Sequence, residues 1–398
     1  MQGQYRPTQA EINLDHLRHN VDRFRNVLPE GVLFSACVKA NAYGHGAVEI
    51  AKELERLDVD YLNVAFLDEA LELRQAGIRS PILVLGYTPP EGIEVAYKHQ
   101  ITVTVFSEEV LQSIEALDPF AMDDHQDNLL KVHLKIDSGM GRLGVITAED
   151  AEHYAQRLKR LSYVMLEGVY THFAKADEED KAYTLIQYQR FMDVVSALRN
   201  QGYSIPIIHT GNSAAAIDTP TLSLDMVRVG ISLYGLYPSA EVDHDAVHLL
   251  PVLTLTTKIV YVKEVPEHWG ISYGTRYYSS KDEKIGTLPI GYADGFSRML
   301  GGKVEVLVRG RRVPVVGTIC MDQCMVSLQS LNEEEEDIKA GEEVVIIGQQ
   351  MGSTISADEL ASKLGTINYE VICMLANRIP RVYMRSGQVI SRVNSLLS

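Results

Sequence analysis

Eight short apolar runs constrain the fold of this chain more than any other feature. Between about residue 10 and residue 240, they alternate with amphipathic, charged stretches of helical spacing, which is typical of repeated strand–helix units. Several runs are continuously apolar, as expected for parallel strands covered by helices. The runs are LFSACV (33–38), YLNVA (61–65), PILVLG (81–86), ITVTVF (101–106), LKVHLKI (130–136), LEGVYTHF (166–173), IPIIHT (205–210) and MVRVGISL (226–233). Eight consecutive units predict a closed (β/α)8 barrel of the TIM type.

A second domain is indicated by a change of pattern beyond about residue 245. There the segments become β-rich and are punctuated by Gly and Pro, as in GKVEVLVRGRRVPVVG. A chain of 398 residues is also long enough for two domains of ordinary size. We therefore predict an α/β barrel over residues 9–243 and a separate mainly-β domain over 244–398, with residues 1–8 as candidates to pack with the second domain.

Charge and hydropathy exclude several classes of partner. The net charge of −16 opposes attraction to nucleic acids and anionic membranes. No stretch approaches the roughly 18–20 apolar residues of a membrane span. The amino terminus lacks the apolar region and cleavage site of a secretion signal, so we expect a cytoplasmic protein. Four scattered cysteines fit neither a disulfide framework nor a paired zinc site, and no metal is expected.

Lys39 is the first candidate for chemistry. Barrel active sites lie at the carboxyl ends of the strands, and Lys39 directly follows the first apolar run. A desolvated lysine loses its proton more readily and attacks carbonyl groups, so this lysine is a candidate Schiff-base former. An ordinary exposed lysine is the alternative for Lys39 taken alone.

A candidate phosphate site follows the last two runs. GNSAAA (211–216) places small residues at a helix start, whose free N–H groups and dipole favour an anion. In the eighth run, Gly230 follows Arg228 and Val229 and allows close backbone approach. Phosphate sites in such barrels are frequently built from these two loops. A common serine cap is the alternative, but together with Lys39 the pattern favours a phosphate-bearing aldehyde.

Nine motifs run in order along nearly the whole chain. They are KANAYGHG (39–46), KIDSGMGRLG (135–144), THFAKAD (171–177), HTGNSAA (209–215), RVGISLYGLYPS (228–239), SYGTRY (272–277), GYADGF (291–296), GTICMDQ (317–323) and INYEV (367–371). In combination they resemble the motifs of the alanine racemases. The resemblance implies a pyridoxal-phosphate-dependent isomerase that interconverts L- and D-alanine and supplies D-alanine, for example as a peptidoglycan precursor; a catabolic role stays equally open. It also implies a homodimer whose active sites draw residues from both subunits.

The resemblance further implies which residues hold pyridoxal phosphate. Lys39 would carry it as a Schiff base, and Arg228 would face the pyridine nitrogen. Arginine keeps its proton under ordinary conditions, so Arg228 would hydrogen-bond that nitrogen without protonating it and leave the ring a weaker electron sink. The other implied cofactor-binding residues are Tyr43, His172, Asn212, Ser213, Gly230, Ile231 and Tyr369.

Inversion of the alanine Cα requires acid–base groups on both faces of a planar carbanion. The resemblance implies that Lys39 serves one face and Tyr273 of the partner subunit the other. A tyrosine has an ordinary pKa of about 10 and needs nearby positive charge to become a useful base. The resemblance implies a hydrogen-bonded chain from Tyr273 through His172 to Arg228, whereas a satisfied strand histidine is the alternative for His172.

Substrate binding and support are implied for six further positions. Arg142 would lie near the substrate carboxylate, and Lys135 matches a lysine that is carbamylated in some members and orients that arginine. Pairing of Lys135 with Asp137 is the alternative. The remaining implied positions are Met321 at the substrate, Tyr292 and Asp322 at the entrance, and His209 in support.

Four other interpretations compete. Gly139, Gly141 and Gly144 spell the GxGxxG of nicotinamide-dependent enzymes, but after a fifth strand rather than a first. His244 and His248 have zincin spacing but lack its glutamate. A pyridoxal-phosphate carrier would lack the second domain with its SYGTRY segment, and a related two-domain decarboxylase is the closest enzymatic rival.

Overall fold

The computed structural model of the protein describes residues 5–118, 129–331 and 338–397. The chain divides into two compact units. The barrel unit comprises Leu17–Ala42 and Ala47–Leu250, and the strand unit comprises the residues up to His16, Tyr43–Gly46 and the residues from Pro251 onward. The barrel unit thus ends at Leu250, and the last segment of the strand unit begins at Pro251. The domain boundary between residues 243 and 244 stays a prediction.

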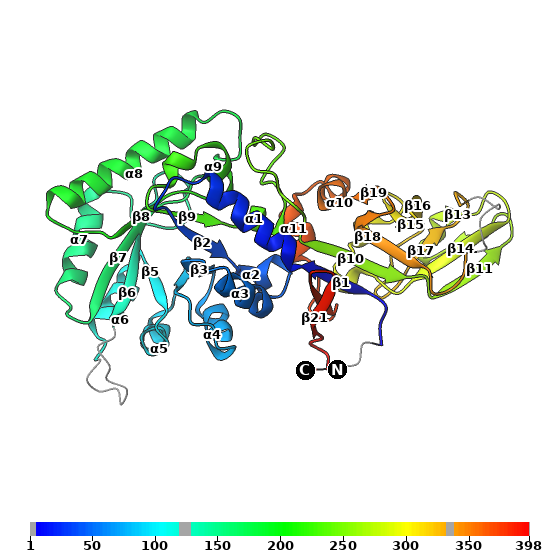
Figure 1. Ribbon diagram of the computed structural model, residues 1–398, viewed down its shortest axis with the longest axis horizontal. Helices are drawn as coiled ribbons and strands as arrows, with labels where there is room; N and C mark the ends of the chain where they lie inside the picture. Colours follow the sequence, from blue (N-terminus) through cyan, green and yellow to red (C-terminus); the bar gives the residue numbers. More distant parts are fainter. Residues whose placement is uncertain (1–4, 119–128, 332–337, 398) are drawn as a thin grey trace. The chain divides into compact units, whose positions relative to one another are not determined.

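The barrel unit contains eight parallel strands, one for each predicted run, so the predicted fold class is confirmed (Figure 1). The strands are β2 (Leu33–Cys37), β3 (Tyr61–Val64), β4 (Ile82–Val84), β5 (Thr102–Val105), β6 (Leu130–Lys135), β7 (Val164–Tyr170), β8 (Ile207–His209) and β9 (Met226–Val229). Their order in the sheet is β8-β7-β6-β5-β4-β3-β2-β9, which follows the chain except that β9 lies beside β2. The last strand is shorter than its apolar run, because the backbone turns after Val229, so Gly230 and Ile231 lie in the following loop.

The barrel is nearly closed where its two edge strands, β8 and β9, approach each other. No strand ladder joins these two strands in the described part of the chain. Instead, the Asp225 N–H donates to the Ile208 carbonyl at 2.9 Å, and the Arg228 N–H donates to the Gly211 carbonyl at 3.1 Å. The loop that follows β8 is therefore held beside β9, towards the end where barrel active sites form.

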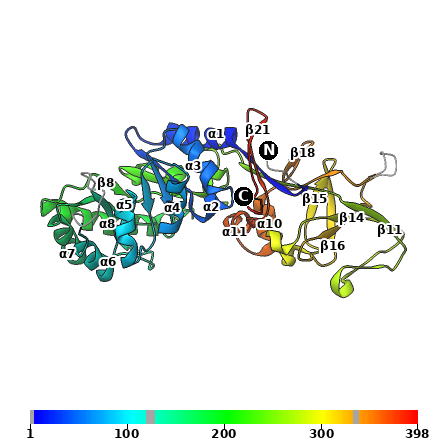
Figure 2. The same cartoon turned by 90° about the horizontal axis from the view of Figure 1, so that it is seen from below.

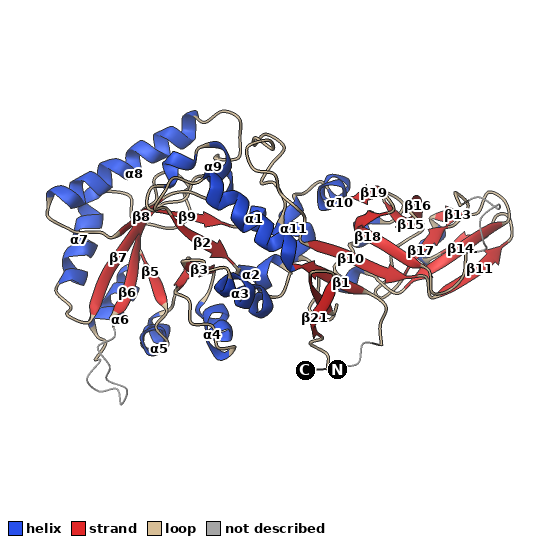
Figure 3. Ribbon diagram, viewed as in Figure 1, coloured by secondary structure: helices blue, strands red, loops and turns tan. Residues whose placement is uncertain are grey.

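Helices surround the barrel strands (Figures 2 and 3). They are α1 (Leu14–Val27), α3 (Ala47–Arg56), α4 (Leu67–Gln75), α5 (Ile93–Lys98), α6 (Glu108–Glu115), α7 (Ala148–Lys159), α8 (Ala182–Asn200) and α9 (Ser213–Asp218). Their apolar positions recur at helical spacing, as in α3, where Ile50, Ala51 and Leu54 are fully buried. Burial of these faces against the strands supplies most of the driving force for the unit.

The strand unit is mainly β, as predicted. One large sheet holds β11 (Tyr261–Val265), β14 (Glu283–Leu288), β17 (Cys324–Ser327), β16 (Arg311–Val316), β15 (Glu305–Val308), β18 (Glu343–Gln350), β10 (Leu253–Lys258), β1 (Gln9–Asn13), β20 (Arg381–Arg385) and β21 (Gln388–Val393) in that order, with β19 (Ser353–Ile355) beside β18. The amino-terminal strand β1 thus lies between β10 and β20. Residues from both ends of the chain build this sheet.

Smaller elements of the strand unit carry several predicted site residues. The hairpin of β12 (Gly270–Ile271) and β13 (Tyr277–Tyr278) encloses the short turn η5 (Tyr273–Thr275). Helices α10 (Ala357–Leu364) and α11 (Asn368–Cys373) follow the sheet, and Ser356 caps α10 by accepting the Glu359 N–H at 3.0 Å. None of the helices among the described residues combines the length and apolar character needed to cross a membrane.

Candidate active site

Lys39 lies just beyond the carboxyl end of β2 and opens a left-handed turn. Ala40, Asn41, Ala42 and Tyr43 all have φ between 52° and 54°, which L-residues seldom adopt in succession. The Ala40 N–H donates to Glu69 Oε1 at 2.6 Å, and Asn41 Oδ1 accepts the Ala47 N–H at 2.8 Å. These bonds hold the reversed turn, and the Lys39 side chain is half-buried at its start.

Arg228 is the most constrained of the predicted cofactor residues. It lies in β9 beside β2, where it pairs with Ser35, and only 3% of it is exposed. Its Nη2 donates to the carbonyls of Thr171 and Thr210, each at 2.9 Å. Among the described residues its Nε–H makes no hydrogen bond, so one directed donor of a buried cation stays available to a ligand.

Two histidines accept hydrogen bonds from Arg228. Its Nη1 lies 2.7 Å from His209 Nδ1, and its Nη2 lies 3.3 Å from His172 Nδ1. Because a guanidinium only donates, both Nδ1 atoms must be unprotonated acceptors. Desolvation and the Arg228 charge hold the pKa of His172 and of His209 well below the ordinary histidine value. Both imidazoles are therefore neutral and carry their proton on Nε2.

The predicted phosphate residues occupy the loops after β8 and β9. Asn212 caps α9 by accepting the Ala215 N–H at 3.0 Å, and Ser213 Oγ accepts the Gly230 N–H at 2.8 Å. The Ser213 hydroxyl proton is thereby left to donate elsewhere. Helix starts present unpaired N–H groups, and those of α9 and of η4 (Ile231–Tyr234) are joined by this contact. The donor set suits a phosphate.

Tyr43 and Tyr369 lie together in the strand unit, with ring centroids 6.2 Å apart. The segment that holds Tyr43 is fastened there by Arg381, whose Nη2 donates to the Gly44 carbonyl at 3.0 Å. The Tyr383 hydroxyl also donates to the His45 carbonyl at 3.0 Å. Two tyrosines that are distant in sequence thus form one pair.

Lys135 is buried at the end of β6 and has no carboxylate partner within the described residues. Its Nζ lies 4.0 Å from the Tyr170 ring centroid. Desolvation, reinforced by the charges of Arg228 and Arg142, holds the pKa of Lys135 well below its ordinary value. Asp137 does not pair with it, because its carboxylate accepts the N–H groups of residues 139–142 at 2.9–3.0 Å. Arg142 itself is exposed.

A second group of predicted residues gathers in the strand unit. Tyr273 is 73% exposed, and its carbonyl accepts the Thr318 hydroxyl at 2.9 Å. The Tyr292 N–H donates to the Cys320 carbonyl at 3.0 Å, which places Tyr292 beside the loop that carries Met321. Tyr292 and Met321 are exposed as well, at 41% and 53%. The catalytic tyrosine and the entrance residues predicted from sequence therefore belong to one group of loops, in which Tyr273, Tyr292 and Met321 have exposed side chains.

Sequence reasoning missed residues that hold these groups. Glu69 binds the Lys39 turn and also accepts the Ala65 N–H at 2.7 Å, yet in sequence it is an ordinary first-turn acid of a helix. Arg378 bridges Asp322 and Asp294, each at 2.7 Å. No local pattern marks their long-range contacts, since Ala40 lies 29 positions from Glu69 and Asp294 lies 84 positions from Arg378.

The residues of the competing motifs make contacts that serve the fold. The GxGxxG glycines form a loop around Asp137, and α7 begins only at Ala148, so they do not open a helix. His244 stacks on Tyr237 with centroids 3.7 Å apart, whereas His248 contacts His19. No group of three metal-ligating side chains exists among the described residues.

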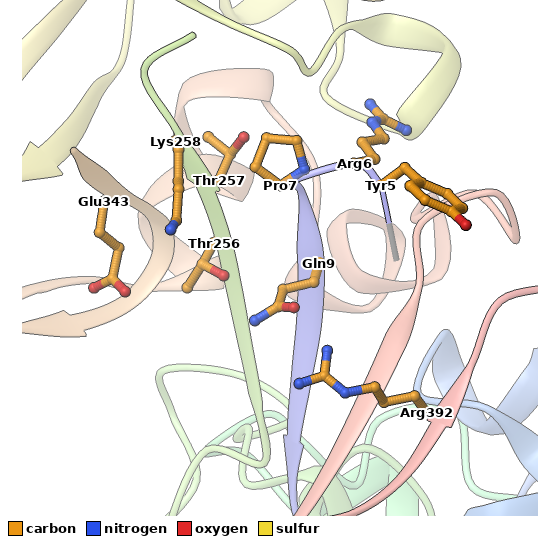
Figure 4. A pocket seen from close by; sticks show the side chains of 9 residues that line it. All are labelled: Tyr5, Arg6, Pro7, Gln9, Thr256, Thr257, Lys258, Glu343 and Arg392. Carbon is orange, nitrogen blue, oxygen red and sulfur yellow. The ribbon is translucent and has the colours of Figure 1, made fainter. Parts of the chain in front are cut away.

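One cavity of the protein lies apart from the candidate site residues. It has a volume of about 400 Å³ and lies within the strand unit (Figure 4). Its walls are Tyr5, Arg6, Pro7, Gln9, Thr256, Thr257, Lys258, Glu343 and Arg392. The candidate site is defined here by its hydrogen-bond geometry.

Comparisons with known proteins point to one family. Residues 12–238 match the family model "Alanine racemase, N-terminal domain", and residues 252–383 match "Alanine racemase, C-terminal domain". "Alanine racemase 2" of Caldanaerobacter subterraneus is 44% identical over 396 residues, which is 100% of both chains. The solved alanine racemase of Clostridium difficile is 44% identical, covers 99% of this chain and 100% of its own, and has a TM-score of 0.91. That of Bacillus anthracis, with bound L-Ala-P, is 41% identical, with 99% of each chain covered and a TM-score of 0.91.

Proposed function

This chain belongs to the alanine racemase family, and on that premise we propose that it interconverts L- and D-alanine with pyridoxal 5'-phosphate held on Lys39. The observation that carries the proposal is the pairing of β2 with β9. It brings a half-buried lysine and a buried arginine with an available Nε–H to the same end of one barrel.

The residues present fit the cofactor by their chemistry. Lys39 offers a primary amine for the aldehyde carbon, and Arg228 offers a donor for the pyridine nitrogen. Ser213 and the N–H groups at the starts of α9 and η4 would bind the phosphate, together with the Tyr43 and Tyr369 hydroxyls. When bound, pyridoxal phosphate supplies the electron sink that allows the alanine Cα proton to leave.

The protein's own residues then move the proton. Lys39 Nζ takes a proton from the alanine Cα, or returns one to it, on one face. Tyr273 of the partner subunit does the same on the opposite face. His172 presents its Nε2–H to that tyrosine while its Nδ1 accepts from Arg228, so the arginine charge stabilises the tyrosine oxygen when it loses its proton.

Arg228 faces the pyridine nitrogen, and Arg142 faces the substrate carboxylate. The four acceptors around Arg228 hold it in one orientation, and it cannot give its proton to the pyridine nitrogen. Arg142 binds the alanine carboxylate. The lowered pKa of Lys135 favours its neutral amine, which is the form that reacts with carbon dioxide to give a carbamate that would pair with Arg142.

We also propose that the protein assembles with a second copy of itself in the cytoplasm. The protein acts as a cytoplasmic homodimer in which each active site combines Lys39 of one protomer with Tyr273 of the partner subunit. The exposed side chains of Tyr273, Tyr292 and Met321 support this assembly, because each is available to another protomer. Met321, Tyr292 and Asp322 would then line the substrate entrance.

The first test is the loss of optical rotation of L-alanine with purified protein and added pyridoxal phosphate. Rapid loss is expected with L-alanine, little with L-serine and none with Lys39→Ala. Lys98→Ala is the matched control, because this exposed lysine on α5 pairs with Glu94 at the surface and should leave the rate unchanged. No loss of rotation, with a visible cofactor absorbance that borohydride abolishes, would instead support the decarboxylase or the carrier.

A further inference from the structure

A line of buried polar side chains runs from Arg228 through the barrel interior. His209 Nε2 lies 2.9 Å from His133 Nδ1, and His133 Nε2 lies 3.2 Å from Glu167 Oε2. Glu167 also accepts the Tyr61 hydroxyl at 2.7 Å and the Lys131 ammonium at 2.6 Å. The histidines are fully buried, and Glu167 is 5% exposed. Only Lys131, at the far end, reaches solvent.

The backbone of β7 has a bulge beside this line of side chains. The register between β6 and β7 shifts between Val132 and His133, so β7 carries one extra residue there, Glu167. Such bulges re-aim a side chain. The next residue is Gly168, where an added Cβ would lie 2.6 Å from the His133 ring. A bulge and a missing side chain together make room for the imidazole and for the carboxylate that binds it.

The two ends of the line permit one proton arrangement. Arg228 only donates, so His209 Nδ1 accepts and His209 Nε2 carries the proton. That proton is donated to His133 Nδ1, so His133 must carry its own proton on Nε2 and donate it to Glu167. An ionised carboxylate only accepts, which completes the series in the same direction. Every hydrogen bond points from Arg228 towards Glu167.

The ionisation states agree with this direction. Burial lowers the pKa of His133 and, with the Arg228 charge, that of His209, so both rings stay neutral. Burial alone would raise the pKa of Glu167, but hydrogen bonds from His133, Lys131 and Tyr61 hold it at about 2. The line therefore ends on a carboxylate at neutral pH.

We propose that Glu167 is a positioning residue for Arg228, acting through His133 and His209. Without its carboxylate, the His133 Nε2–H would be a buried donor without an acceptor, which is costly. If that proton moved to His133 Nδ1, two donors would face each other, because His209 Nε2 is also protonated. If the His209 proton then moved to Nδ1, it would face the N–H of Arg228. Loss of the acceptor at Glu167 thus disturbs the group that orients Arg228.

The tautomers can be read directly by NMR of the full chain labelled with ¹⁵N in its histidine rings, prepared without cofactor. Signals are assigned with His133→Gln and His209→Gln. We expect both residues of the wild type at neutral pH to show a protonated Nε2 and an unprotonated Nδ1. A protonated Nδ1 at either residue of the wild type would overturn the proposal, whether or not any variant folds.

Variants then test the role of Glu167. Glu167→Gln keeps an acceptor and should keep both tautomers, whereas Glu167→Leu should populate the Nδ1–H form. Gly168→Ala adds a Cβ against the His133 ring and should also populate the Nδ1–H form. This variant replaces Glu167→Leu in the test if the leucine variant does not fold. The matched control is Glu55→Leu, since Glu55 also accepts hydrogen bonds in the barrel unit, at residues 79 and 80, but has no link to Arg228. Unchanged tautomers in both Glu167→Leu and Gly168→Ala would count against the proposal.

The consequence for activity rests on the proposed racemase function. With pyridoxal phosphate added, Glu167→Leu should lower kcat by about tenfold, by analogy with the roughly 10–100-fold cost of removing residues that orient metal ligands. Glu167→Gln should restore most of this rate, and Glu55→Leu should retain it. If the wild type neither binds the cofactor nor racemises alanine, the proposed function fails, while the tautomers of the cofactor-free chain still decide the role of Glu167.

Discussion

At the scale of single residues, Arg228 combines burial, full charge and a fixed orientation. Both His172 and His209 present unprotonated Nδ1 atoms to it. A carboxylate in its place would require those atoms to become donors, and it would favour protonation of the pyridine nitrogen instead of opposing it. The arginine thus determines how strongly the bound ring withdraws electrons, and so which reactions follow loss of the Cα proton.

Replacement of Arg228 by glutamate should therefore change the reaction outcome as well as its rate. We expect Arg228→Glu to lower racemisation by about 100-fold or more, as for other losses of fixed electrostatic groups, and to raise the share of transamination. Pyruvate formed per racemisation event measures this share. Arg228→Lys, which keeps the cation, is the control. A glutamate variant with an unchanged share would contradict this account of Arg228.

Glu167 should make a pH-dependent contribution to stability. Its pKa is about 2 in the fold against an ordinary 4.5, so its stabilising effect is complete above 4.5 and is lost as pH falls from there towards 2. A shift of this size corresponds to at most roughly 3 kcal/mol of unfolding free energy. Urea unfolding of wild type and Glu167→Gln between pH 6 and pH 3 should show the difference in stability shrinking as the pH falls. A constant difference would exclude this linkage.

At the scale of elements, the left-handed turn after Lys39 stores strain next to the proposed cofactor lysine. Left-handed helical backbone costs L-residues roughly 1–2 kcal/mol each. Here the cost is offset by the hydrogen bonds that Glu69 and Asn41 accept and by the Arg381 and Tyr383 bonds to the segment that follows. Because the turn begins at Lys39, these contacts also fix the backbone position from which the lysine side chain extends.

Glycine substitution measures that strain. Ala40 is exposed, so Ala40→Gly removes little packing and should raise the free energy of unfolding by up to about 1 kcal/mol. The same change at Ala197, in the right-handed helix α8, should lower it by about 1 kcal/mol. Denaturant unfolding of both variants gives the comparison. Equal destabilisation at the two positions would show that the turn is not left-handed in solution.

At the scale of the whole molecule, the proposal that Lys39 and Tyr273 act from different protomers can be tested by mixing two variants. Coexpression of Lys39→Ala and Tyr273→Ala chains separates a shared site from a site within one chain. If each site combines Lys39 of one protomer with Tyr273 of the partner subunit, a mixed dimer has one intact site, and random pairing should restore about a quarter of wild-type activity. Each variant alone should be inactive. Confirmed mixed dimers without activity would contradict the shared site.

The apolar pattern along the chain was enough to predict the fold class and the approximate positions of the barrel strands. The eight apolar runs predict the eight barrel strands because burial on both faces demands apolar side chains at consecutive positions. Lys39, Ser213 and Arg228 could be selected because barrel chemistry lies at strand ends, and strand ends can be read locally. The nine motifs then identified the family, which the comparisons confirm.

The contacts between distant side chains could not be predicted from local patterns and are seen only in the folded chain. The Arg228–His209–His133–Glu167 line joins residues from four strands, and no spacing along the chain encodes that they share one interior layer. Glu69, Arg378 and Glu167 were missed for the same reason, since a glutamate or arginine has the same local pattern whether it binds a distant backbone or faces water. The bulge at Glu167 and the reversed turn at Ala40 also depend on distant contacts, because hydrogen bonds made elsewhere in the fold stabilise a backbone that local propensity disfavours.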